Sequence, residues 1–169
     1  MSFQADPNAK SRAGFTPLHL SSQEGHREMS SMLIENGADV GAKANNGLTA
    51  MHLCAQEDRV PVAEVLHNHG ADVNAKTKAG YSKKNILCVC VREIFKFLAP
   101  LHVASHFGQL NMVRWLIEHG ADVNEKTQAA YTSLHQAAQQ GHNNCVRYLL
   151  ENGASPNAQN AVSNMRVSL

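Results

Sequence analysis

The chain has 169 residues, of which 43% are apolar and 17% are charged, so it is long enough for one ordinary domain and is not disordered throughout. The formal net charge is +1 and no polybasic run is present, which argues against nucleic acid as a partner. Residues 1–7 lack the apolar stretch of a signal peptide, and the longest apolar run, 86–91, is too short to cross a bilayer. We therefore expect a cytoplasmic protein that does not insert into the membrane.

A short motif recurs along the chain, and its last residue is His19, His52, His102 and His135 in turn. The spacings between these histidines are 33, 50 and 33 residues. Gly-Ala pairs that begin at Gly37, Gly70, Gly120 and Gly153 repeat the same three spacings. Two independent markers therefore indicate a 33-residue unit, with 17 extra residues in the third copy.

Each unit contains the signals for two short helices. In the first unit Thr16 is suited to cap a helix and Pro17 fits the first helical position. Gly25 suits a left-handed turn before a second helix, and Gly37 suits the end of that helix. We expect helix pairs at residues 17–24 and 27–36, 50–57 and 60–69, 100–107 and 110–119, and 133–140 and 143–152, with no extensive sheet. One such unit cannot bury its apolar face alone, so the units must stack into an all-α solenoid of helix-turn-helix units with protruding loops.

The register divides the chain into consecutive units. Residues 1–13 form the end of a preceding unit, and whole units follow at 14–46, 47–79, 80–129 and 130–162, before a non-repeat tail at 163–169. The third unit is interrupted by an insert at 83–99. Because polar capping units are missing, both end faces would expose apolar surface. We interpret the chain as a fragment or truncated product of a longer array.

The insert has three interpretations. It is placed at 83–99 because its removal joins Gly80-Tyr81-Ser82 to Pro100-Leu101-His102. A surface loop is tolerable since closure entropy grows slowly with loop length. A binding element would use the apolar residues between 87 and 98, which fall on one face of a helix. We favour the third interpretation, a retained intron, because suitable codons for Ser82-Lys83 and Leu98-Ala99 would contain splice-donor and splice-acceptor strings, and excision would restore Thr before Pro100.

Some positions depart from the repeat pattern. Asp58 replaces the turn glycine of the second unit, and Ala50 and Ser133 replace the motif proline. Ser30 and His67 occupy core positions between helices that are apolar in the fourth unit. We expect these changes to weaken individual units rather than to change the fold.

The 33-residue period with Thr-Pro-Leu-His resembles the ankyrin repeat. Segments 55–60, 62–66, 134–142 and 152–157 further resemble late repeats in the membrane-binding array of the ankyrins, the adaptors that tie membrane proteins to spectrin. This resemblance implies a protein-binding scaffold at the spectrin–actin membrane skeleton, whose partners are cytoplasmic tails of channels, transporters or adhesion molecules. The alternative is an ankyrin-repeat regulator that binds a soluble signalling protein. A third hypothesis is a repeat module of an enzyme whose catalytic domain lies outside this chain.

The sequence contains no recognisable catalytic or metal-binding pattern. The motif histidines recur at one structural position, and the resemblance implies that they form local hydrogen bonds. Cys88-Val89-Cys90 lacks a second Cys/His pair at zinc spacing, and the four cysteines of a chain without a secretory signal are expected to be free thiols. A phosphate-binding loop, a nucleophile elbow and a His-Glu-x-x-His motif are all missing. We therefore expect no enzyme activity, no metal and no cofactor.

The expected binding surface is the concave side of the stack, and we expect the chain to act there as a monomer. Loop-tip candidates are Lys43, Asn45, Lys76, Lys78, Lys126 and Gln128. First-helix candidates are Gln23, Glu24, Gln56, Glu57, His106 and Gln139. For each residue the alternative is an ordinary solvated position.

Overall fold

A computed structural model describes residues 5–78 and 97–158, and these contain eight α-helices and no strand. The helices are α1 (Pro17–Glu24), α2 (Arg27–Glu35), α3 (Ala50–Gln56), α4 (Val60–Asn68), α5 (Pro100–Phe107), α6 (Leu110–Glu118), α7 (Ser133–Gln140) and α8 (Asn143–Glu151). Every helix end lies within one residue of its predicted position. The prediction of an all-α repeat fold is confirmed.

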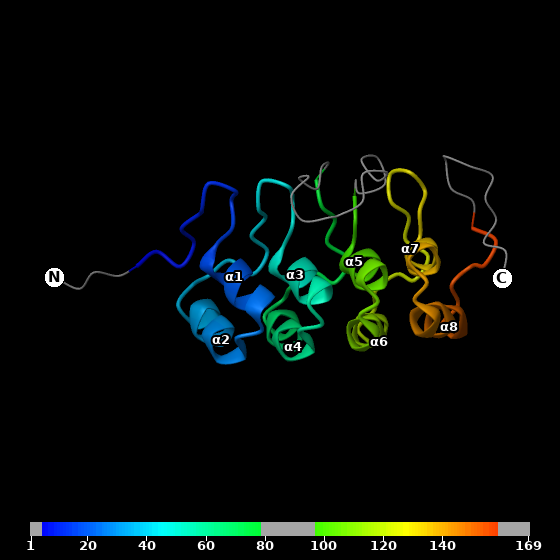
Figure 1. Cartoon of the computed structure of the whole chain (residues 1–169). Coiled ribbons are helices and arrows are strands. Elements are labelled where there is room, and N and C mark those ends of the chain that lie inside the picture. The colour runs from blue at the N-terminus through cyan, green and yellow to red at the C-terminus, as the bar shows by residue number, and fades with distance from the viewer. Residues whose placement is uncertain (1–4, 79–96, 159–169) are drawn as a thin grey trace.

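The helices form two rows. Figure 1 shows α1, α3, α5 and α7 side by side in one row, with α2, α4, α6 and α8 in a second row beneath them. The described parts of the connections between consecutive helix pairs project from the first row on the side away from the second row. Each helix pair therefore packs on the next, and the loop tips line up along one edge of the stack.

Left-handed residues join the two helices of each pair. Gly25, Gly108 and Gly141 have φ values of 85°, 73° and 75°, and Asp58 adopts the same region with φ 55°. The Asp58 carboxylate accepts a hydrogen bond from the backbone N–H of Met112 at 2.9 Å and from the Asn111 amide at 2.8 Å. The expectation that Asp58 only weakens its unit is therefore wrong, because its carboxylate caps the first turn of α6 in the next repeat.

The core contains a leucine or methionine and small apolar residues from the first helices, together with the apolar faces of the second helices. Leu18, Met51, Leu101 and Leu134 occupy the same repeat position and are almost completely buried. The two expected weak points differ from each other. Ser30 is buried but its hydroxyl lies 2.9 Å from that of Ser21, so its polarity is satisfied. The buried Nδ1 of His67 has no hydrogen-bond partner, and its ring packs edge to face on Trp115.

The third repeat resumes earlier than the sequence analysis placed it. Leu98 accepts a hydrogen bond from the backbone N–H of Thr77 at 3.0 Å, as Leu48 does from Ala44 at 2.9 Å. Phe97 has a positive φ of 63°, like Gly47 at the same point of the second repeat. Residues 97–99 therefore belong to the repeat, and the prediction that the insert extends through Ala99 is wrong. The sequence favours residues 80–82 because they match the motif, whereas the loop closes at Leu98, whose N–H also donates to the Thr77 hydroxyl at 3.0 Å. The remaining insert residues lie outside the described part of the chain.

Candidate protein-binding surface

The four motif histidines fasten each loop to the helix that follows it. Their Nδ1 atoms accept from the backbone N–H groups of Thr16, Thr49, Ala99 and Thr132 at 3.1, 3.3, 3.2 and 3.2 Å. Because Nδ1 accepts, the proton of each neutral ring is on Nε2. The Nε2–H of His19 donates to the Leu48 carbonyl and that of His52 to the Leu98 carbonyl, so these rings also connect consecutive repeats.

Burial keeps these imidazoles neutral. It lowers the pKa of His52 and of His102 to about 4, because a charged ring would lose its hydration inside the stack. Burial also lowers the pKa of His19 and of His135. Both ring nitrogens of His52 and His102 are engaged in hydrogen bonds. These histidines are therefore structural, as the sequence analysis expected.

Asparagine side chains form a second set of links between repeats. Asn74 donates to the Gly120 carbonyl at 3.1 Å and accepts from the Asp122 N–H at 3.0 Å. Asn124 makes the same pair of bonds to Gly153 and Ser155, and Asn8 makes them to Gly37 and Asp39. The sequence analysis missed this role, although the recurrence of Asn at one repeat position was the available signal. Gly41 occupies that position in the first repeat and cannot form the link.

The predicted loop-tip residues form one exposed edge. Lys43, Asn45, Lys76, Lys78, Lys126 and Gln128 are all exposed. Asn45 also connects loops, since its amide donates to the Arg12 carbonyl at 3.1 Å. Lys10 and Arg12 lie at the corresponding positions of the preceding loop and are exposed as well. They were not among the predicted residues, although adding the 33-residue period to Lys10 leads to Lys43.

The predicted first-helix residues differ in their accessibility. Glu24 and Gln139 are exposed, whereas Gln23, Gln56 and Glu57 are half-buried. His106 shares the repeat position of the three glutamines but is only 9% exposed, and its Nδ1 lies 3.1 Å from Oε1 of Gln136. Most of the predicted residues thus lie on two neighbouring strips, the loop edge and the ends of the first helices. His106 has little accessible surface for a partner.

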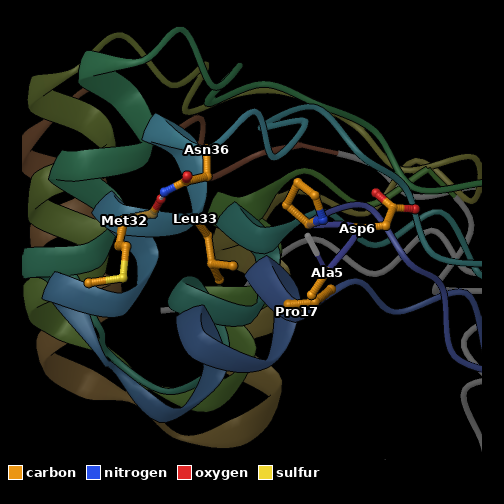
Figure 2. A pocket seen from close by; sticks show the side chains of 7 residues that line it. Ala5, Asp6, Pro17, Met32, Leu33 and Asn36 are labelled. Atoms are coloured by element: carbon orange, nitrogen blue, oxygen red, sulfur yellow. Dashed lines mark hydrogen bonds between the residues drawn. The ribbon is translucent and has the colours of Figure 1, made fainter. Parts of the chain in front are cut away.

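An open hollow of about 570 Å³ lies at the N-terminal edge of the stack. Figure 2 shows Met32 and Leu33 of α2, with Asn36 just after its end, on one side of the hollow, and Pro17 and the segment 5–7 on the other. Five of its seven lining residues are apolar, and its one carboxylate is that of Asp6. No arrangement for catalysis is present among these residues.

Two other kinds of site were sought in residues 5–78 and 97–158. No group of three or more His, Cys, Asp or Glu side chains could hold a metal ion there. None of the described helices is both long enough and apolar enough to span a membrane. The two cysteines in this part of the chain, Cys54 and Cys145, are free and buried.

The comparison with protein families decides the assignment. A family model described as "Ankyrin repeats (3 copies)" matches residues 1–77 and 82–160, which is most of the chain. The chain belongs to the ankyrin-repeat family. Ankyrin repeats are protein-interaction modules, so this protein is a protein-binding scaffold. No curated protein gives a significant match to the sequence.

Proposed function

We propose that this ankyrin-repeat chain is an adaptor that links membrane proteins to the spectrin–actin cytoskeleton. The support is the resemblance of segments 55–60, 62–66, 134–142 and 152–157 to late repeats of the membrane-binding ankyrin array. In this proposal the partners are cytoplasmic tails of channels, transporters or adhesion molecules. The chain acts as a monomer at the cytoplasmic membrane skeleton, without an enzyme activity, a cofactor or nucleic acid.

The proposed contact surface is the pair of strips formed by the loop edge and the ends of the first helices. The observation that carries it is the alignment of polar groups at equal repeat positions. Gln23, Gln56 and Gln139 recur along the first helices, and an amide can both donate to and accept from the main chain of an extended peptide. The exposed loop residues lie along the neighbouring edge. A tail lying along the stack would meet a glutamine amide in the first, second and fourth repeats, with His106 at this position in the third.

The partner class is tested by affinity capture with the full chain immobilised. The probes are purified fusions of cytoplasmic tails from spectrin-linked channels, transporters and adhesion molecules, beside a panel of soluble kinases and transcription factors. Retention of the tails alone supports the adaptor. Retention of the soluble panel alone would replace it with the signalling regulator.

The contact surface is tested with one exposed first-helix residue and a matched control. Gln139→Arg places a long charged side chain on the proposed surface. Asn144→Arg places the same side chain at an exposed position of α8, in the second row. We expect the tails to bind about tenfold more weakly to Gln139→Arg, a change of about 1.4 kcal/mol, with Asn144→Arg close to the unmodified chain. Equal affinities for the two variants would place the binding surface elsewhere.

A further inference from the structure

The loop edge carries a row of lysines at one repeat position. Lys10, Lys43, Lys76 and Lys126 are exposed and occupy successive loops. The Lys10 ammonium donates to the Lys43 carbonyl at 3.4 Å, and the Lys43 ammonium donates to the Lys76 carbonyl at 3.3 Å. Lys76 pairs with the Glu125 carboxylate at 2.8 Å. Each of these three side chains therefore extends from its own loop to the next one. The charged groups form a single line along the loop edge.

Charge is separated between the loops and the helices. The loop segments 9–13, 42–46, 75–78 and 125–129 contain this lysine row together with Arg12 and Lys78, and their only acidic residue is Glu125. The eight helices have the opposite balance, since they carry Glu in excess of Arg and contain no Lys. A chain with a formal net charge of only +1 thus presents basic groups along the loop tips, and the exposed carboxylates of Asp6, Asp39, Asp72 and Asp122 precede these segments in the same loops.

We propose that the lysine row binds an extended acidic peptide whose carboxylates recur at every third residue. This inference rests on the proposed scaffold function and names the chemistry of its partner. Packed helices lie about 8–10 Å apart, which sets the spacing of successive loops, and an extended chain rises about 3.3 Å per residue. Three residues of the partner therefore span one repeat, and each carboxylate comes opposite one ammonium, with that of Lys76 shared with Glu125.

A peptide fits this edge better than other polyanions. Duplex DNA carries about one negative charge per 1.7 Å along its axis, and both DNA and an anionic membrane are best neutralised by a broad basic face. The basic groups here are one row wide, and the first-row helices beside the loops contain no Lys or Arg that would broaden the row. Exposed amides at Asn45 and Gln128 lie in the same loops and add hydrogen-bonding groups for a peptide main chain.

The spacing is tested by fluorescence anisotropy with the full chain and two labelled peptides of equal composition. One peptide has four Glu residues at every third position between Ser residues, and the other has the four Glu residues together. At low ionic strength we expect the spaced peptide to bind about tenfold more tightly, with an affinity that falls as salt is added. Equal binding of the two peptides would overturn the spacing, and failure of both to bind would overturn the proposal.

The site is tested with Lys43→Glu/Lys126→Glu against Arg27→Glu/Arg147→Glu, which makes the same charge change at exposed helix positions. We expect the lysine variant to lose about tenfold or more in affinity for the spaced peptide and the arginine variant to lose about twofold. If the charge-reversed loops do not fold by circular dichroism, the corresponding Lys→Gln pair replaces them. Equal losses in the two variants would contradict a localised site.

The remaining measurements separate this proposal from its alternatives. Lysine-dependent binding of a short DNA duplex or of phosphatidylserine vesicles, without binding of the spaced peptide, would assign the row to a different class of partner. Membrane-protein tails that bind the Lys43→Glu/Lys126→Glu variant as well as the unmodified chain would leave the adaptor function standing and overturn the acidic-peptide proposal. Loss of the tails and of the spaced peptide in the same variant supports both.

Discussion

The first and third repeats place similar residues at the same positions but in opposite surroundings. Leu20, Met29 and Met32 in the first repeat are 52%, 53% and 62% exposed. Their counterparts in the third repeat, Val103, Met112 and Trp115, are 2%, 0% and 8% exposed. The difference is that the third repeat packs on the helices of the second, whereas among the described residues only the loop segment 5–13 precedes the first. Whether a position belongs to the core is thus decided by the neighbouring repeat as well as by its own.

This comparison indicates that the interfaces between repeats contribute to stability, because they bury apolar side chains that the first repeat leaves exposed. In a stacked array the total is the sum of the intrinsic stability of each repeat and the terms between neighbours. Intrinsic terms are similar wherever the motif is similar, whereas within the described residues no helix packs on the N-terminal side of the first repeat. Its exposed methionines and the hollow of Figure 2 lie on this same edge.

The largest expected effect is a difference between two methionine-to-alanine substitutions at one repeat position. Met112→Ala removes a fully buried side chain and leaves a cavity, so we expect a loss of about 2–5 kcal/mol in the free energy of unfolding. Met29→Ala acts on a side chain that is already half exposed, and we expect a change within about 0.5 kcal/mol. Urea unfolding followed by circular dichroism measures both. Similar losses would mean that the N-terminal edge is covered in solution.

The next effect is a loss of stability in acid caused by the interior histidines. The pKa of His52 and of His102 is about 4 in the folded chain and 6.5 in the unfolded chain, so the unfolded chain binds more protons between these values. Stability is therefore complete above pH 6.5 and falls as the pH falls towards 4, at a rate approaching about 1.4 kcal/mol per pH unit for each histidine.

Urea unfolding at a series of pH values checks this slope. His52→Gln is expected to lower the stability at neutral pH, because the link to the Leu98 carbonyl is disturbed, and to make the decline in acid shallower. An unmodified chain whose stability stays constant from pH 6.5 to pH 5 would contradict the neutral, buried state of these rings.

Most of the fold follows from the sequence because the repeat supplies the same local signals several times. Thr16 before Pro17 predicts the start of α1, and the 33-residue register carries that prediction to the other pairs. The resumption of the third repeat at Phe97 was not predictable from residue types, because Leu98 contributes only its backbone N–H and carbonyl to the closure, and these bond to the hydroxyl and N–H of Thr77. Asp58 was misjudged for a related reason, since its partner Met112 belongs to the next repeat.

The binding surface was predictable only in part. The 33-residue register identified the exposed loop positions. Extending this register one period towards the N-terminus would have added Lys10 and Arg12. Burial of His106 was not predictable, because it depends on Gln136, a neighbour one repeat away that replaces the apolar residues of the earlier units. Periodicity thus indicates which residues share a face, while the size and polarity of the next repeat decide how much of each is accessible.

The smallest expected effect is a gain, and it concerns the link that the first repeat lacks. Gly41 has the local turn of its counterparts, since its N–H bonds to the Asp39 carboxylate at 2.9 Å as that of Asn74 does to Asp72 at 2.8 Å. Its φ is not positive, and a Cβ there would meet nothing closer than an Asp39 oxygen at 3.5 Å. Gly41→Asn should therefore place an amide between the Gly70 carbonyl and the Asp72 N–H, by analogy with Asn74.

Two new hydrogen bonds predict a gain of about 1–2 kcal/mol in the free energy of unfolding, and Asn74→Gly should lose a similar amount between the second and third repeats. Both variants are compared with the unmodified chain by urea unfolding, and amide hydrogen exchange at Asp72 and Asp122 reports whether each N–H becomes protected or exposed. If Gly41→Asn is more stable than the unmodified chain and the Asp72 N–H is protected from exchange, the first interface is weak because it lacks one side chain. If protection appears without a gain in stability, the asparagine links only fix the register of neighbouring loops, and the difference between the first interface and the later ones resides in apolar packing alone.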